Sequence, residues 1–200
     1  MFESVLGLDS GINLVYGESA TGKTTLCLQI AGEKAIKSKV VFIDTENGFS
    51  LERFKQIYPE DYKERLNNIN LARVSNFDEQ CKVFDTIKNV KKVDLVIVDT
   101  IGMHYRERVK EDSYDANKKI DKQLKILKEL FNRDVKVIIS NQVYSNITTN
   151  KIQVVGGNML RNWSSVVMKM EKNPRKIIKE KPKEEIIEFK IDNKGITLIS

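Results

Sequence analysis

The sequence contains few of the residues that build transition-metal sites. Among its 200 residues there are one histidine, His104, and two cysteines, Cys27 and Cys81. The cysteines lack metal-ligand spacing, and a single histidine argues against a histidine-based zinc site. Packing in the core is therefore the favoured interpretation of both thiols, and a reducing cytoplasm fits this composition.

Long apolar segments are also missing. The longest apolar runs have the length of a β-strand, which argues against a membrane-spanning helix. The opening residues MFESVLGLDSG lack a basic leader followed by an apolar stretch, which argues against a secretory signal. We therefore expect a cytoplasmic protein with no membrane partner.

The residues that are present suit one folded domain. Hydrophobic residues make up 40 % of the chain and charged residues 31 %, and 200 residues can bury a substantial core. We expect residues 1–200 to form that single domain. The balance of 34 basic and 28 acidic residues gives a net charge of +6, which permits an acidic partner without establishing one.

A phosphate-binding loop is the strongest motif in the chain. Residues 17–24, GESATGKT, match G-x-x-x-x-G-K-[S/T], between an apolar strand at 12–16 and a helix at 25–37. Such a loop points backbone N–H groups and a helix N-terminus at phosphate. The predicted nucleotide-binding residues are Gly17, Glu18, Ser19, Ala20, Thr21, Gly22, Lys23, Thr24 and Thr25.

Strands and helices alternate along the chain, which is typical of an α/β fold with a largely parallel sheet. The predicted strands are 12–16, 40–44, 69–74, 93–98, 135–140 and 164–170, followed by an antiparallel hairpin of 186–191 and 196–199. The predicted helices are 25–37, 50–58, one that follows the capping residue Asn76, and one that turns Ile120, Leu124, Leu127 and Phe131 inward. Residues 105–117 and 146–155 are predicted to be polar loops, the second one mobile.

Three polar positions at strand ends suggest further chemistry. Asp99 ends the apolar strand LVIVD and is predicted to hold Mg²⁺ directly or through water. Many ATPases place a glutamate directly after this aspartate, but Thr100 stands here, so Glu46 becomes the candidate that activates water. From spacing alone, Glu46 is equally well interpreted as a water-activating residue or as a solvated loop carboxylate. Spacing also leaves Gln142 open as a γ-phosphate sensor or a turn residue.

Together these segments resemble the RecA-type recombinases, and most of all their archaeal and eukaryotic branch. The matching segments are GESATGKT, FIDTENGFSLERF, LVIVDT, IISNQV and VVGGNML, in the order that the family has them. The resemblance implies a P-loop NTPase with a RecA-like core: a twisted, mostly parallel sheet flanked by helices, with a C-terminal antiparallel hairpin. The resemblance covers nearly the whole chain. We therefore expect the family's helical N-terminal domain to be absent, an arrangement that resembles an archaeal recombinase paralogue.

The resemblance also implies roles for individual residues, with ATP and Mg²⁺ as cofactors. Lys23 and Thr24 resemble the phosphate and magnesium ligands, and Asp99 the metal carboxylate. Glu46 resembles the water-activating glutamate, and Gln142 the amide that couples the γ-phosphate to a DNA-binding loop. Arg53 resembles an arginine that packs on adenine, although a solvated helix charge is the alternative.

Two loops are implied to bind DNA. Arg106, Arg108 and Lys110 lie where the family has its first DNA-binding loop, and Lys151 lies in the second. Ordinary solubility is the alternative for each of these side chains. A basic cluster also interrupts the terminal strands, and it is interpreted as a DNA-contacting arm or a solvated loop. Its residues are Lys172, Arg175, Lys176, Lys179, Lys181 and Lys183.

The function implied by the resemblance is an accessory one in homologous recombination and DNA repair. The family's Pro-containing cap over a neighbour's ATP is shortened here to residues 180–185, so hydrolysis is expected to be weak. We also expect it to be independent of DNA. The implied partners are single-stranded or branched DNA, the main recombinase and a nuclease that processes Holliday junctions. Three alternatives remain open: an active strand-exchange recombinase, a signalling ATPase of the same fold without DNA function, and a small-molecule kinase.

Overall fold

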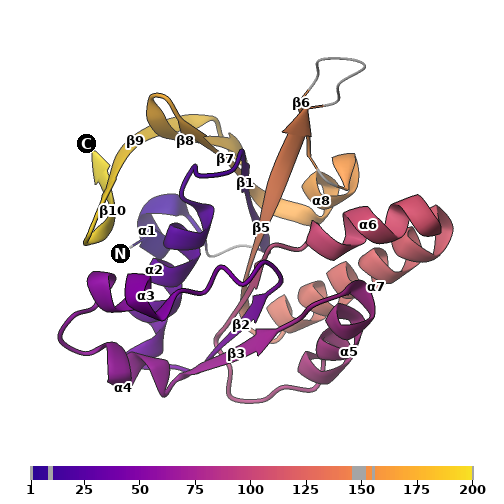
Figure 1. Ribbon diagram of the computed structural model, residues 1–200, viewed down its shortest axis with the longest axis horizontal. Coiled ribbons are helices and arrows are strands. Elements are labelled where there is room, and N and C mark those ends of the chain that lie inside the picture. Colours follow the sequence, from indigo (N-terminus) through magenta and orange to yellow (C-terminus); the bar gives the residue numbers. More distant parts are fainter. Residues whose placement is uncertain (1, 9–10, 146–151, 155, 200) are drawn as a thin grey trace.

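The protein is built on one sheet with helices on both of its faces (Figure 1). The computed structural model describes residues 2–8, 11–145, 152–154 and 156–199. The strands are β1 (Ile12–Gly17), β2 (Val40–Asp44), β3 (Ile69–Arg73), β4 (Leu95–Asp99), β5 (Lys136–Ser145), β6 (Ile152–Val154), β7 (Ser164–Lys172), β8 (Arg175–Lys181), β9 (Glu185–Asp192) and β10 (Gly195–Ile199). The helices are α1 (Phe2–Leu6), α2 (Lys23–Ala35), α3 (Leu51–Ile57), α4 (Tyr62–Leu66), α5 (Phe77–Ile87), α6 (Met103–Glu111), α7 (Ser113–Phe131) and α8 (Gly157–Trp163).

The parallel part of the sheet carries the carboxyl ends at which a nucleotide is expected. The strand order is β10-β9-β8-β7-β1-β5-β4-β2-β3, with β6 paired to β5. Strands β7, β1, β5, β4, β2 and β3 are parallel to their neighbours in that row. This confirms the predicted α/β fold, and it places β4 between β5 and β2.

Two apolar layers cover the sheet, one on each face. Leu14 of β1 packs in the layer of α5 and α7, whereas its neighbour Val15 packs in the layer of α2 and α3. Alternate strand residues point to opposite faces, so a strand that is covered on both sides must be apolar throughout. Figure 1 shows these helices on the two sides of the sheet. The continuous apolar runs of the sequence are explained by this double burial.

The C-terminal part of the sheet is antiparallel and larger than predicted. The expected hairpin is confirmed, because β9 pairs with β10 in an antiparallel register. The basic stretch 172–183, interpreted as an arm or a solvated loop, is instead mostly strand: β8 pairs with both β7 and β9. Only Ile177 in its middle is fully buried. This strand could not be recognised in the sequence, because the lysines around Ile177 leave little alternation of apolar and polar residues.

The prediction of a loop at residues 105–117 is wrong, because α6 and the first turn of α7 occupy this stretch. The side chain of Asp112 caps α7 by accepting a hydrogen bond from the backbone N–H of Asp115 at 3.0 Å. Helix α6 is polar over most of its surface, and it buries only His104 and Tyr105. Its stability therefore comes from tertiary contacts that local sequence does not reveal.

The segment 146–155 was predicted to be a mobile loop. Its residues 146–151 and 155 lie outside the described part of the chain. Residues 152–154 form β6, which pairs with the end of β5. Strand β5 therefore extends past the predicted end at residue 140. The short elements α1, α4 and α8 were also not predicted.

A tight contact between α2 and Tyr58 leads to a prediction of stability. A Cβ on Gly32 would overlap the Tyr58 ring. The ring cannot easily move, because its hydroxyl donates to the Gln29 carbonyl at 2.6 Å and the Arg65 guanidinium lies 4.1 Å from its centroid. We expect Gly32→Ala to lower the free energy of unfolding by about 1–3 kcal/mol in urea unfolding, although alanine favours helices. In a Tyr58→Ala background the same change should be stabilising, and a loss there as well would contradict this explanation.

Candidate nucleotide-binding site

The phosphate-binding loop joins β1 to α2 by a turn that needs glycine. Gly22 directly precedes α2 with φ of 106°, in the left-handed region that favours glycine. A side chain on Gly17 would overlap the Met170 carbonyl of β7. The Thr21 hydroxyl closes the turn by donating to the Glu18 carbonyl at 3.0 Å. The loop is therefore held in shape by its own contacts and by the neighbouring strand.

Lys23 points into this loop. Its Nζ donates to the carbonyls of Gly17 at 2.9 Å and of Glu18 at 2.8 Å. Burial lowers the pKa of Lys23, and the nearby Asp99 and Glu46 carboxylates oppose that shift. The ammonium is thus pre-positioned at the rim of the loop, where a phosphate can replace the carbonyls as its partner.

Asp99 and Thr24 meet at the position expected for a metal ion. The Asp99 carboxylate accepts hydrogen bonds from the hydroxyls of Ser140 and Thr24. Burial raises the pKa of Asp99. A hydroxyl and a carboxylate side by side are oxygen ligands of the kind that Mg²⁺ prefers, completed by phosphate and water. Among the described residues there is no cluster of three or more His, Cys, Asp or Glu that could hold a metal.

The turn after β2 is organised by Asp44, the last residue of that strand, which was not predicted as a site residue. Its carboxylate accepts hydrogen bonds from the backbone N–H groups of Gly48 at 2.9 Å and Phe49 at 3.0 Å. The next residue, Thr45, cross-links to Thr100: its hydroxyl donates to the Thr100 carbonyl at 2.8 Å and accepts from the Thr100 N–H at 2.9 Å. These contacts fix the turn that carries Glu46.

Glu46 and Gln142 lie in direct contact. The Gln142 Nε2 donates to both carboxylate oxygens of Glu46, at 2.9 and 2.7 Å, and the Thr100 hydroxyl donates to Oε1 at 2.8 Å. Gln142 lies opposite Gly17 in the register of β5 and β1. The carboxylate and the amide are therefore both adjacent to the phosphate-binding loop. The threonine that replaces the usual glutamate helps to hold Glu46 in place.

A polar cavity of about 540 Å³ lies over the loop, within the range of sites for small ligands. It contains the three predicted catalytic residues Lys23, Glu46 and Gln142. Arg53 borders it from α3, and its guanidinium donates to the carbonyl of Asp192 at 2.7 Å. The other lining residues are Ser19, Ala20, Gly22, Thr24, Thr25, Thr100, Arg175, Ile191, Asp192 and Asn193. Those from Arg175 onward come from the antiparallel extension and carry no nucleotide motif.

A family model described as Rad51 matches residues 5–198. The chain belongs to the Rad51 family. Among its curated relatives are proteins named DNA repair and recombination protein RadB. The RadB of Methanococcoides burtonii is 36 % identical over 173 residues, covering 83 % of this chain and 76 % of the relative. The RadB of Methanococcus maripaludis is 35 % identical over 202 residues, covering 94 % and 92 %.

A solved structure gives the same result for the fold. The crystal structure of the RadB recombinase superimposes with a TM-score of 0.81 at 28 % identity, covering 100 % of this chain and 96 % of the other. The predicted resemblance to RecA-type recombinases is therefore confirmed, and so is the RecA-like fold. This Rad51-family chain is most informatively compared with archaeal RadB proteins.

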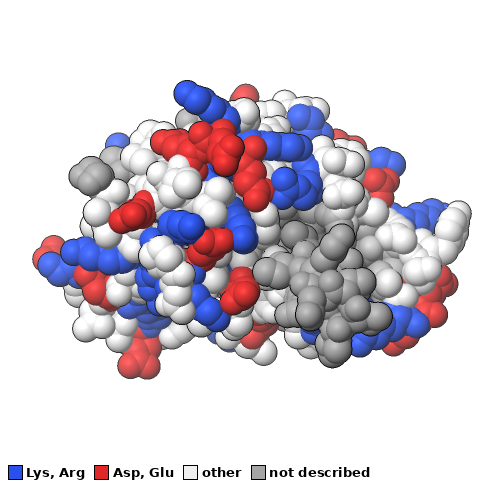
Figure 2. Space-filling model, turned by 90° about the horizontal axis from the view of Figure 1, so that it is seen from above, with Lys and Arg blue, Asp and Glu red and all other residues white. Residues whose placement is uncertain are grey.

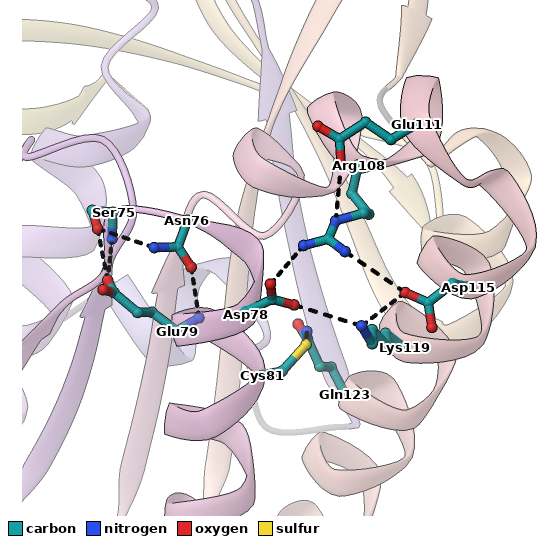
Figure 3. A network of polar contacts seen from close by, with 10 residues as sticks. All are labelled: Ser75, Asn76, Asp78, Glu79, Cys81, Arg108, Glu111, Asp115, Lys119 and Gln123. Carbon is teal, nitrogen blue, oxygen red and sulfur yellow. Dashed lines mark hydrogen bonds and ion pairs between the residues drawn. The ribbon is translucent and has the colours of Figure 1, made fainter.

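The residues predicted to contact DNA in this Rad51-family chain differ in their surroundings. Arg106 and Lys110 are exposed on α6, and Arg106 also borders a small cavity that Glu46 and Gln142 line. Arg108 forms ion pairs with carboxylates of three helices, at 2.7 Å to Asp78 of α5, 3.5 Å to Glu111 of α6 and 4.0 Å to Asp115 of α7 (Figure 3). Lys151 lies outside the described residues. Arg106 and Lys110 are thus the more available candidates.

The charge on the face seen in Figure 2 is mixed. Lysine and arginine side chains alternate there with groups of aspartate and glutamate, and the described residues form no single basic band on it. Electrostatic attraction of nucleic acid to the described residues of this face would therefore be local. In the described part of the chain, none of the helices has the length and apolar character needed to cross a bilayer.

Proposed function

We propose that this chain is an ATP-binding and DNA-binding accessory protein of homologous recombination and repair, with weak ATPase activity and no strand exchange of its own. One observation carries the proposal: the contact of Glu46 with Gln142 beside the phosphate-binding loop. Gln142 belongs to β5, which continues to the segment where the family resemblance places DNA. The names of the RadB relatives, which refer to DNA repair and recombination, support the same role.

ATP and Mg²⁺ are the proposed cofactors. Lys23 and the backbone of residues 17–25 would hold the phosphates, and Thr24 and Asp99 would hold the magnesium ion. Arg53 would pack on adenine. When bound, the ion neutralises phosphate charge and orients the reacting phosphoryl group.

The carboxylate of Glu46 would accept a proton from water, because it lines the cavity next to the phosphate-binding loop. In the observed arrangement both of its oxygens receive hydrogen bonds, from Gln142 and Thr100. These bonds orient the carboxylate and occupy both of its oxygens. Slow hydrolysis fits that arrangement. If Gln142 moved away from Glu46, the carboxylate would lose two of its three hydrogen bonds.

Arg106, Lys110 and Lys151 are the proposed DNA contacts, with Arg108 as a weaker candidate because of its ion pairs. The proposed partners are single-stranded or branched DNA, the main recombinase and a Holliday-junction-processing nuclease. We further propose that residues 1–200 act as one ATPase core in the cytoplasm.

The proposal is tested by measuring DNA binding and phosphate release together. Single-stranded and branched oligonucleotides should bind at low salt, with affinity falling linearly on logarithmic axes as salt rises. Phosphate release should be slow and unchanged by DNA. Arg106→Ala should weaken DNA binding and reduce the salt slope by about 1. Arg133→Ala should do neither, because its guanidinium, just past the C-terminal end of α7, donates to the Lys88 carbonyl at the end of α5.

Two results would contradict it. If no DNA binds at low salt under any nucleotide condition, the recombination role is wrong. If DNA strongly accelerates phosphate release, the active strand-exchange alternative replaces the accessory role.

A further inference from the structure

Arg175 occupies a place in the nucleotide cavity that its sequence context did not suggest. As part of the basic stretch 172–183 it was interpreted as a contact to DNA or solvent. It is the first residue of β8, and it lines the same cavity as Lys23, Glu46 and Gln142. No phosphate motif includes it, so its position depends entirely on the antiparallel extension of the sheet.

The register of three strands explains how Arg175 reaches the loop. Gly17, the last residue of β1, lies opposite Met170 of β7. Strand β7 therefore runs on past the start of the phosphate-binding loop. It turns back at once, because Lys172 pairs with Arg175 in the hairpin with β8. Arg175 returns over the loop, and its Nη1 donates to the Thr21 carbonyl at 3.4 Å.

The two cations of this hairpin differ in their partners. Lys172 forms an ion pair with Glu18 of the loop at 3.1 Å. No carboxylate within residues 2–8, 11–145, 152–154 or 156–199 forms an ion pair with Arg175. Arg175 and Lys23 line one cavity. Two like charges at one cavity repel each other, and a bound anion offsets that repulsion in addition to the carboxylates of Glu46 and Asp192 that also line the cavity.

We propose that Arg175 is a further nucleotide-binding residue, which contacts the phosphates of a nucleotide bound to its own chain. The inference rests on the proposed binding of ATP. A guanidinium presents a planar set of donors to phosphate oxygens, whereas Lys23 acts as a point charge. The β7–β8 hairpin would then supply, within one subunit, positive charge beside the phosphates.

Titration of a fluorescent ATP analogue against the whole chain tests the proposal. Arg175→Gln removes the charge but keeps a hydrogen-bonding side chain, and it should weaken binding about tenfold. Arg175→Lys keeps the charge and should stay within about threefold of the wild type. Lys172→Ala is the matched control on the same hairpin. It loses only the contact to Glu18, and its affinity should remain close to that of the wild type.

The outcomes separate this inference from the function on which it rests. If the wild type binds no ATP, the proposed function fails. If the wild type binds and Arg175→Gln binds equally well, only the role of Arg175 fails. An equal loss in Lys172→Ala would mean that the hairpin merely braces the loop. Mixing Arg175→Gln with Lys23→Ala should restore no phosphate release, and restoration would show that the arginine acts across subunits.

Discussion

Lys23→Ala is expected to weaken ATP binding by about 100-fold or more, and phosphate release should fall with it. Each hydrogen bond from the buried ammonium to a charged phosphate contributes about 1.5–3 kcal/mol, and Lys23 is placed to form more than one. The substitution also leaves the carbonyls of Gly17 and Glu18 without the donor that they now share. The loop would therefore lose a ligand for phosphate and part of its own support.

Calorimetric titration with ATP measures this effect, and Lys34→Ala is the matched control. Lys34 lies in the last turn of the same helix, far along α2 from the loop. Its removal takes away the same net charge and a side chain of the same length, so it controls for the change in the net charge of the protein. Equal affinities for the two variants would mean that the loop binds ATP without Lys23.

The backbone part of this site could be predicted from sequence, because it depends on neighbouring residues. Gly17, Gly22 and Lys23 occur in one short motif between a strand and a helix, and the turn has the predicted form. Asp99 was predicted for a similar reason, since it ends an apolar strand. In both cases the chemistry is encoded within a few residues of the element that positions it.

The partners of Glu46 could not be predicted by the same means. Glu46 follows β2, Thr100 follows β4 and Gln142 lies on β5. Their contact requires β4 to lie between the other two strands, an order that no local pattern specifies. Spacing therefore left the role of Glu46 open, and only the family resemblance favoured the water-activating one.

Helix α6 and strand β8 were missed because of their charge. Helix α6 is held by Arg108, which reaches Asp78 across 30 positions of sequence. Strand β8 has lysines at positions where strands usually carry apolar residues, and it is stabilised by pairing on both edges. Hydrophobic periodicity in a sequence indicates an element that buries one face. It therefore does not reveal elements that are held in place by long-range polar contacts. Arg175 was assigned to a DNA arm or a solvated loop for this reason.

Glu46→Gln is expected to lower the rate of phosphate release by about 10²- to 10⁴-fold, the range typical of losing a general base. The amide keeps the size of the carboxylate and can still accept the hydrogen bond from Thr100. It cannot accept a proton from water. Affinity for ATP should therefore stay close to that of the wild type, which separates this variant from Lys23→Ala. Single-turnover measurements with excess protein resolve the change even when hydrolysis is slow. Glu52→Gln, on the exposed side of α3, is the control.

The contact between Gln142 and Glu46 allows a second test of the role of Glu46 in hydrolysis. Gln142→Ala removes the two hydrogen bonds from Gln142 Nε2 to the Glu46 carboxylate and leaves the one from Thr100, so the carboxylate is held less firmly and the hydrolysis rate should change. If Gln142 acts only through Glu46, the same substitution should have no further effect in the Glu46→Gln background. Additive effects would instead mean that Gln142 acts on the phosphates independently. An undiminished rate in Glu46→Gln alone would remove Glu46 from the chemistry altogether, and the base would have to lie elsewhere around the cavity.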